Sequence, residues 1–130
     1  MSTTTFTAPR FADFFDTPLP LGLRELAGEM SWDDVADTFG SSTGRVAISE
    51  PTFASLATEP GPLAALTAML YDQGIAVEML NFHQLRAGGQ TATFIRGTDG
   101  VGTEWAIGWS ECATQSALRA LVACANRLAA

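Results

Sequence analysis

The sequence predicts an α+β fold in which two helices cover one face of a β-sheet. Bulky residues alternate with small ones from Trp105 to Ser110, which is the period-two pattern of a strand. Apolar residues then recur at helical spacing from Leu118 to Leu128. An earlier alanine-rich helix also adjoins predicted strands. We therefore expect two pseudo-symmetric strand–strand–(strand)–helix units, preceded by a small helical N-terminal segment.

The first forty residues have helical signals and few strand signals. Short helices are predicted from Pro9, over residues 23–28 and from Ser31 to Gly40. Ser31 is a typical N-cap because its hydroxyl can accept a first-turn N–H, and Asp34 in that turn favours the helix dipole. We divide the chain into a helical N-terminal appendage, residues 1–40, and an α+β domain, residues 41–130.

The first predicted unit of the α+β domain ends in a helix. Residues 45–48 have the composition of a strand, Pro51 interrupts pairing, and residues 52–56 form a second strand at an edge. A helix then follows from Gly61 to Gly74, with Pro62 at its first position and Gly74 at its C-terminal cap.

The second predicted unit contains three strands and the last helix. The strands lie over residues 75–85, 91–96 and 103–110, and a glycine turn over residues 87–90 joins the first two. Ser110 to Thr114 forms the junction between the last strand and the last helix. A helix N-terminus presents unpaired backbone N–H groups, so this junction can hold an anion.

Composition excludes several classes of function. The 130 residues carry a net charge of −7 and no lysine, and the seven arginines are scattered, so we expect no nucleic-acid partner. An acidic membrane surface would repel such a chain, and no apolar run reaches the roughly 20 residues of a membrane helix. The N-terminus lacks the pattern of a signal peptide. A cytoplasmic protein is expected.

Two cysteines flank the last predicted helix. At about 1.5 Å rise per residue, Cys112 and Cys124 lie roughly 18 Å apart, beyond the reach of a disulfide. We expect two free thiols, consistent with a reducing compartment.

Three residues are candidates for chemistry. His83 is the only histidine, and it either hydrogen-bonds at the rim of the strand or acts as a general acid/base or ligand contact. Cys112 either fills the core or is a thiol activated by the helix N-terminus. Glu111 beside it can pair with His83 if the two face one pocket.

Other patterns carry less chemistry. Glu59 precedes the first long helix and either favours its dipole or faces a ligand. Trp105 and Trp109 fill the core or a dimer interface, or form a stacking wall for a planar ligand. The sequence has no zinc pattern, no nucleotide fingerprint and no Ser-His-Asp motif, so we expect no metal and no cofactor.

Three motifs resemble a known family. They are Gly61-Pro62-Leu63-Ala64-Ala65 at the first long helix, Ala76-Val77-Glu78-Met79-Leu80-Asn81-Phe82 in the next strand, and Glu111-Cys112-Ala113-Thr114-Gln115-Ser116 before a helix that ends Asn126-Arg127. Residues 45–127 are similar to the C-terminal allosteric, leucine-binding dimerisation domain of 2-isopropylmalate synthases and citramalate synthases. Residues 21–39 resemble, more weakly, the linker subdomain of those enzymes, and the catalytic barrel is absent.

The resemblance implies a homodimer that binds an amino-acid effector between its protomers. It places the ligand at the start of the first long helix, on the strand that follows, and at the junction before the last helix. The residues expected to bind the ligand are Gly61, Pro62, Leu63, Ala64, Asn81, His83, Trp109, Glu111 and Cys112.

Two functional hypotheses follow. The first is a freestanding, non-catalytic homodimer that binds an amino acid or related small carboxylate and controls a separate catalytic synthase subunit. The second is a small cofactor-independent enzyme in a biosynthetic pathway, in which the former effector pocket performs an acid–base isomerisation, cyclisation or lyase-type step with His83, Glu111 and Cys112.

Overall fold

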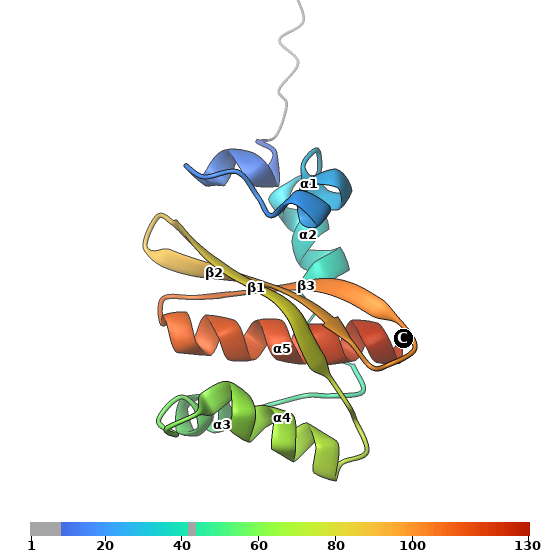
Figure 1. Cartoon of the computed structure of the whole chain (residues 1–130). Helices are drawn as coiled ribbons and strands as arrows, with labels where there is room; N and C mark the ends of the chain where they lie inside the picture. The colour runs from blue at the N-terminus through green and yellow to red at the C-terminus, as the bar shows by residue number, and fades with distance from the viewer. Residues whose placement is uncertain (1–8, 42–43) are drawn as a thin grey trace, which may run out of the picture.

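The α+β class is confirmed, and the elements are stacked in layers (Figure 1). The computed structural model describes residues 9–41 and 44–130. The N-terminal helices cover one face of a three-stranded sheet, helix α5 (Ala113–Ala129) covers the other face, and α3 and α4 pack beneath α5. The residues on which the signal-peptide prediction depends lie mostly outside the described part of the chain.

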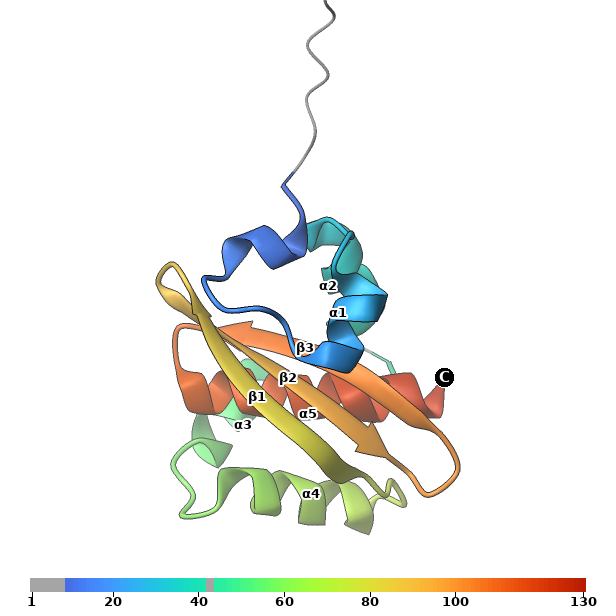
Figure 2. The same cartoon turned by 45° about the horizontal axis from the view of Figure 1, so that its top comes forward.

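The sheet is antiparallel and has the strand order β1-β2-β3. Its strands are β1 (Glu78–Ala87), β2 (Gln90–Thr98) and β3 (Thr103–Ser110), which confirms the three predicted strands in this region. A tight turn joins β1 to β2, and Gly88 in it has a φ of 61°, a backbone conformation that glycine adopts at low cost. Because β1 is the first strand in the order, it is an edge strand, and Figure 2 shows its long free edge above α4.

One face of β3 is bulky and the other is closely covered, as the alternation predicts. Trp105 and Ile107 pack against the N-terminal helices, whereas Ala106 faces α5. At Gly108 the approach is closest, because a Cβ there would lie 2.3 Å from the backbone nitrogen of Ala120. The small residues on this face of β3 let α5 lie directly on the sheet.

The N-terminal helices share a core with the upper face of the sheet. They are the 3₁₀ helix η1 (Phe11–Phe14), α1 (Leu21–Ala27) and α2 (Trp32–Phe39). Phe11 and Phe15 pack edge-on against Phe94 of β2, and Trp32 packs edge-on against Trp109 of β3. The predicted cap is confirmed, because the Ser31 Oγ accepts a hydrogen bond from the Asp34 N–H at 3.2 Å.

The strands predicted at residues 45–48 and 52–56 are wrong. Residues 45–48 have no regular structure, and α3 (Glu50–Leu56) occupies the second range. Ser49 caps this helix by accepting the Thr52 N–H at 3.3 Å, and Pro51 lies in its first turn, where a missing N–H costs nothing. The first unit therefore has no strand among its described residues, and the pseudo-symmetry of two strand-bearing units is lost.

The arrangement of the two long helices also differs from the prediction. Helix α4 (Pro62–Asp72) forms where predicted, with Gly74 at φ of 82° just after it. However, its buried residues Leu66 and Leu70 belong to the core on the far side of α5, so α5 alone lies directly on the lower sheet face. No helix in the described residues has both the length and the hydropathy needed to cross a bilayer.

Candidate ligand-binding site

A hollow of about 310 Å³ lies where the start of α4, the lower face of β1 and the start of α5 meet. The N-terminal ends of two helices from opposite ends of the domain sequence thus meet at one place beneath the edge strand. We call it the helix-start hollow. Its lining residues are Gly61, Pro62, Leu63, Ala64, Phe82, Gln84, Ala113, Thr114 and Ala117.

The N-termini of both helices are open at this hollow. Gly61 is the N-cap of α4 and has no side chain that could cap the helix. Cys112 is the N-cap of α5, and its side chain makes no capping hydrogen bond. Neither helix has an acidic residue in its first turn. The first N–H groups of a helix carry partial positive charge, so two uncapped helix starts favour a negatively charged group between them.

A chain of hydrogen bonds fixes the orientation of Gln84. Its Nε2 donates to the Ala113 carbonyl and to the Thr93 Oγ1, both at 3.0 Å. The Thr93 and Ser116 hydroxyls lie 2.7 Å apart, and the Ser116 hydroxyl donates to the Gly108 carbonyl at 3.1 Å. Because the Ala113 carbonyl can only accept, the amide nitrogen must face it. The Gln84 Oε1 therefore remains free to accept a hydrogen bond from a ligand.

The rest of the hollow is apolar. Phe82, which is 43% exposed, and the aliphatic side chains of Leu63 and Ala117 form its walls. None of the residues that line it carries an ionisable side chain. A small molecule with one anionic end and an apolar body matches this distribution of groups.

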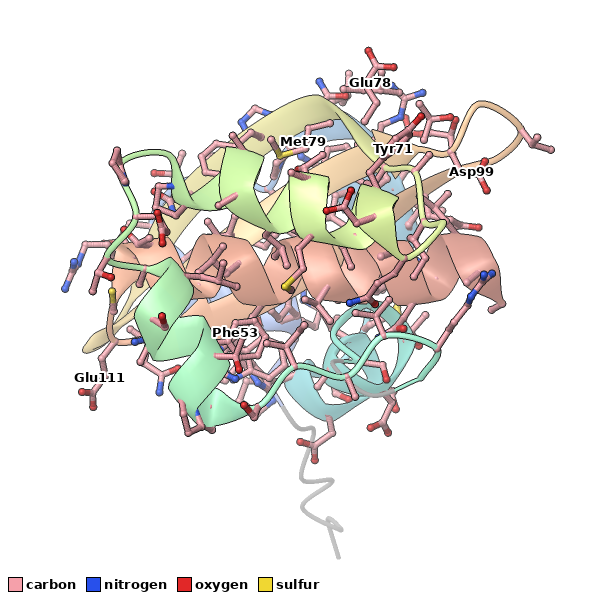
Figure 3. All side chains as sticks on the ribbon, turned by 90° about the horizontal axis from the view of Figure 1, so that it is seen from below. Phe53, Tyr71, Glu78, Met79, Asp99 and Glu111 are labelled. Carbon is pink, nitrogen blue, oxygen red and sulfur yellow. The ribbon has the colours of Figure 1, made fainter. Side chains whose placement is uncertain are left out.

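The structure places only part of the expected ligand set at the hollow. Gly61, Pro62, Leu63 and Ala64 line it, whereas Glu111 and Cys112 stand just before α5 and do not. Glu111 is exposed and extends away from the domain (Figure 3). Cys112 is also exposed, so the interpretation that it fills the core is wrong.

Asn81, His83 and Trp109 lie on the opposite face of the sheet. Asn81 and His83 line a separate cleft beside α1, and Trp109 packs against the N-terminal helices. The pairing of β1 with β2 sets these faces. His83 lies opposite Phe94 of the upper core, whereas Phe82 lies opposite Ile95 on the face that α5 covers. Glu111 and Cys112 are exposed just before α5, so His83, Glu111 and Cys112 do not converge.

The residues of β1 and α5 that complete the hollow, chiefly Phe82 and Gln84, are not among the ligand-binding residues expected from the sequence. The signal that could have found Phe82 is its apolar character on a strand whose neighbours Asn81 and His83 are polar. Gln84 gave no signal, because its role depends on Thr93 and Ala113, which are distant in sequence.

The two cysteine thiols differ in burial, since Cys112 is exposed and Cys124 is buried. Both cysteines are free, as predicted, and burial raises the pKa of the Cys124 thiol to about 11, so it stays protonated at neutral pH. Within residues 9–41 and 44–130, no group of three or more His, Cys, Asp or Glu side chains is placed to hold a metal ion.

Neither models of protein families nor the sequences of curated proteins match this chain. The resemblance to the regulatory domain of isopropylmalate synthases therefore depends on the three motifs alone. Two of them, at Gly61-Pro62 and at Glu111–Ser116, lie at the starts of α4 and α5, where the hollow forms.

Proposed function

We propose that this protein is a non-catalytic, homodimeric domain of the cytoplasm that binds an amino acid or related small carboxylate in the helix-start hollow. The observation that carries the proposal is the meeting of two uncapped helix N-termini over an apolar hollow. The carboxylate lies at the N–H groups of α4 and α5, and the apolar part contacts Phe82 and Leu63. An ammonium group of the ligand donates to the Gln84 Oε1.

Binding is favoured over catalysis by the placement of the reactive side chains. The enzymatic alternative needs His83, Glu111 and Cys112 at one site. His83 lines the cleft beside α1, whereas Glu111 and Cys112 are exposed just before α5 and line neither that cleft nor the helix-start hollow. The groups that do face the hollow are backbone N–H groups, a threonine hydroxyl and a carboxamide, which recognise a ligand without transferring protons at neutral pH. By the resemblance to the synthase domains, the bound ligand regulates a separate catalytic subunit.

Branched-chain amino acids should stabilise the protein, and filling the hollow should abolish the effect. At a hundredfold excess over its dissociation constant, L-leucine or L-isoleucine should add about 2.7 kcal/mol to the free energy of unfolding, or roughly 10 °C to Tm. Ala64→Leu places a larger side chain in the hollow and should remove the shift in differential scanning fluorimetry.

Ala68→Leu is the matched control, because Ala68 is also exposed on α4 but does not line the hollow. This variant, and His83→Ala, should keep the full shift. A shift that survives Ala64→Leu would place the ligand elsewhere, and the absence of a shift with either amino acid would remove branched-chain amino acids from the proposal.

The homodimer in this proposal forms through the free edge of β1. Met79, Leu80 and Phe82 are 37%, 45% and 43% exposed on this strand, and Figure 3 shows Met79 next to α4. An exposed apolar edge strand is a template for pairing with another chain. Because Phe82 also lines the hollow, a second copy on β1 would lie against the ligand.

A charge placed on the apolar edge tests this interface. Leu80→Lys should weaken the dimer several-fold in sedimentation velocity, because a lysine on an exposed edge strand opposes pairing with a second copy. Val101→Lys is the matched control, because Val101 is 98% exposed between β2 and β3, away from β1, and this variant should dimerise as the wild type does. A monomer at every concentration, or a Leu80→Lys variant that dimerises normally, would refute pairing through β1.

A further inference from the structure

A second cleft, of about 490 Å³, lies on the upper face of the sheet beside the start of α1. We call it the sheet-face cleft. The sheet separates it from the helix-start hollow, so it is a different site. Its lining residues are Pro20, Leu21, Gly22, Asn81, His83, Arg96 and Trp105.

Three of these residues form a row across the strands. Asn81 of β1 pairs with Arg96 of β2, which pairs with Trp105 of β3, and paired residues of antiparallel strands project from the same face. Arg96 donates from Nη1 to the Asn81 Oδ1 at 3.3 Å. That bond uses the carbonyl end of the Asn81 amide, so its Nδ2 remains as a donor.

All polar side chains of the cleft can donate hydrogen bonds, and no carboxylate lines it. The Arg96 guanidinium uses one N–H on Asn81 and has four others. The Trp105 Nε1–H has no partner in the described structure, and a Cβ on Gly22 would lie 3.1 Å from that nitrogen, so glycine keeps the indole edge accessible. His83 adds a further ring N–H at the rim.

Arg96 differs from the other half-buried arginines in its partners. Arg119 and Arg127 each pair with a carboxylate, of Glu50 and Glu104 respectively. Arg96 is also half-buried but has no anionic partner within the described residues, although the chain has twice as many acidic as basic side chains. Partial burial of an unpaired guanidinium is unfavourable, and an anion in the cleft would compensate for it.

We propose that the sheet-face cleft binds the oxyanion of a small molecule, a carboxylate or a phosphate, through Arg96. The guanidinium donates to the oxyanion in the charge-assisted, bidentate manner for which its planar shape is suited. The Trp105 Nε1–H, the Asn81 Nδ2 and the His83 ring complete the donor set. Leu21 and Pro20 contact the remainder of the molecule. This proposal is independent of the function assigned to the helix-start hollow.

The indole N–H of Trp105 gives a direct readout. In ¹H–¹⁵N correlation spectra its resonance is assigned by its loss in Trp105→Phe. The full chain is titrated with sodium phosphate and, separately, with sodium benzoate, with chloride keeping the ionic strength constant. We expect a saturable shift of this resonance with at least one of the two, and the responding probe identifies the oxyanion class.

Variants locate the anion. Arg96→Gln should weaken binding by about ten- to a hundredfold, the range for losing hydrogen bonds to a charged group. His83→Ala, at an exposed position that cannot disturb the core, should weaken it several-fold. Arg86→Gln is the matched control. Arg86 makes no ion pair within the described residues, and its partner in the strand register is Thr91, away from the cleft, so this variant should bind as the wild type does.

Three results would overturn the proposal. They are a Trp105 shift that grows linearly without saturation, a shift that chloride alone reproduces, and equal affinities of the wild type, His83→Ala and Arg96→Gln. The His83→Ala comparison retains its force if Arg96→Gln does not fold.

Discussion

Replacing Asn126 with aspartate is expected to lower the free energy of unfolding by about 3–5 kcal/mol. Asn126 is 8% exposed on α5, and its Oδ1 accepts the Val46 N–H at 2.7 Å. Its Nδ2 donates to the carbonyls of Val46 at 2.9 Å and of Ser41 at 3.4 Å. One carboxamide thus holds the irregular segment before α3 against α5. Aspartate would turn the donor into a charged acceptor that faces two carbonyl oxygens.

Urea unfolding followed by circular dichroism measures this loss, and Asn81→Asp serves as the control. Asn81 is exposed, and a carboxylate there would still accept from Arg96, so its stability should stay within about 0.5 kcal/mol of the wild type. If Asn126→Asp lowers the free energy of unfolding by less than about 1 kcal/mol, the Asn126 carboxamide does not anchor the irregular segment before α3.

Gly108→Ala is expected to cost about 3 kcal/mol or more, the upper range for overpacking a core. The added Cβ would lie 2.3 Å from the Ala120 nitrogen, 2.5 Å from the Ser116 carbonyl oxygen and 2.9 Å from the Ala120 Cα. All three contacts are backbone atoms, so no side-chain rotation can relieve them. Helix α5 must move away from β3, and its start would then move within the helix-start hollow.

Gly89→Ala is the matched control, since a Cβ at Gly89 has no atom within 4 Å and its φ is not positive. Chemical denaturation should show little change for Gly89→Ala and a much lower midpoint for Gly108→Ala. The close packing of α5 on β3 would be disproved by equal midpoints. If Gly108→Ala folds, its affinity for leucine should also fall.

Local pattern was enough to predict the elements that have a strong period or a specific cap. The alternation from Trp105 to Ser110, the apolar stripe of α5 and the cap at Ser31 each depend on residues within one turn or one strand. The same local rules also explain α3. Its signals are Ser49 as N-cap and Pro51 in the first turn, but Pro51 is equally compatible with a break in a strand, so the local pattern does not separate the two.

The candidate site was predictable at the helix starts and not on β1. Gly61-Pro62 and the junction before α5 are sequence signals for helix N-termini, and the structure brings the two starts together. Local alternation separates Phe82 and Gln84 from Asn81 and His83, but it does not say which face of the strand meets α5. The pairing of β1 with β2 decides this, because it places Phe82 opposite the buried Ile95.

The sequence by itself therefore determined the α+β class, most of the element types and the two helix starts, because periodicity and capping depend on neighbouring residues. Only the tertiary structure decided which face of β1 meets which layer, that the N-terminal helices cover the upper sheet face, and that Arg96 has no carboxylate partner among the described residues. Each of these depends on contacts between residues far apart in the chain.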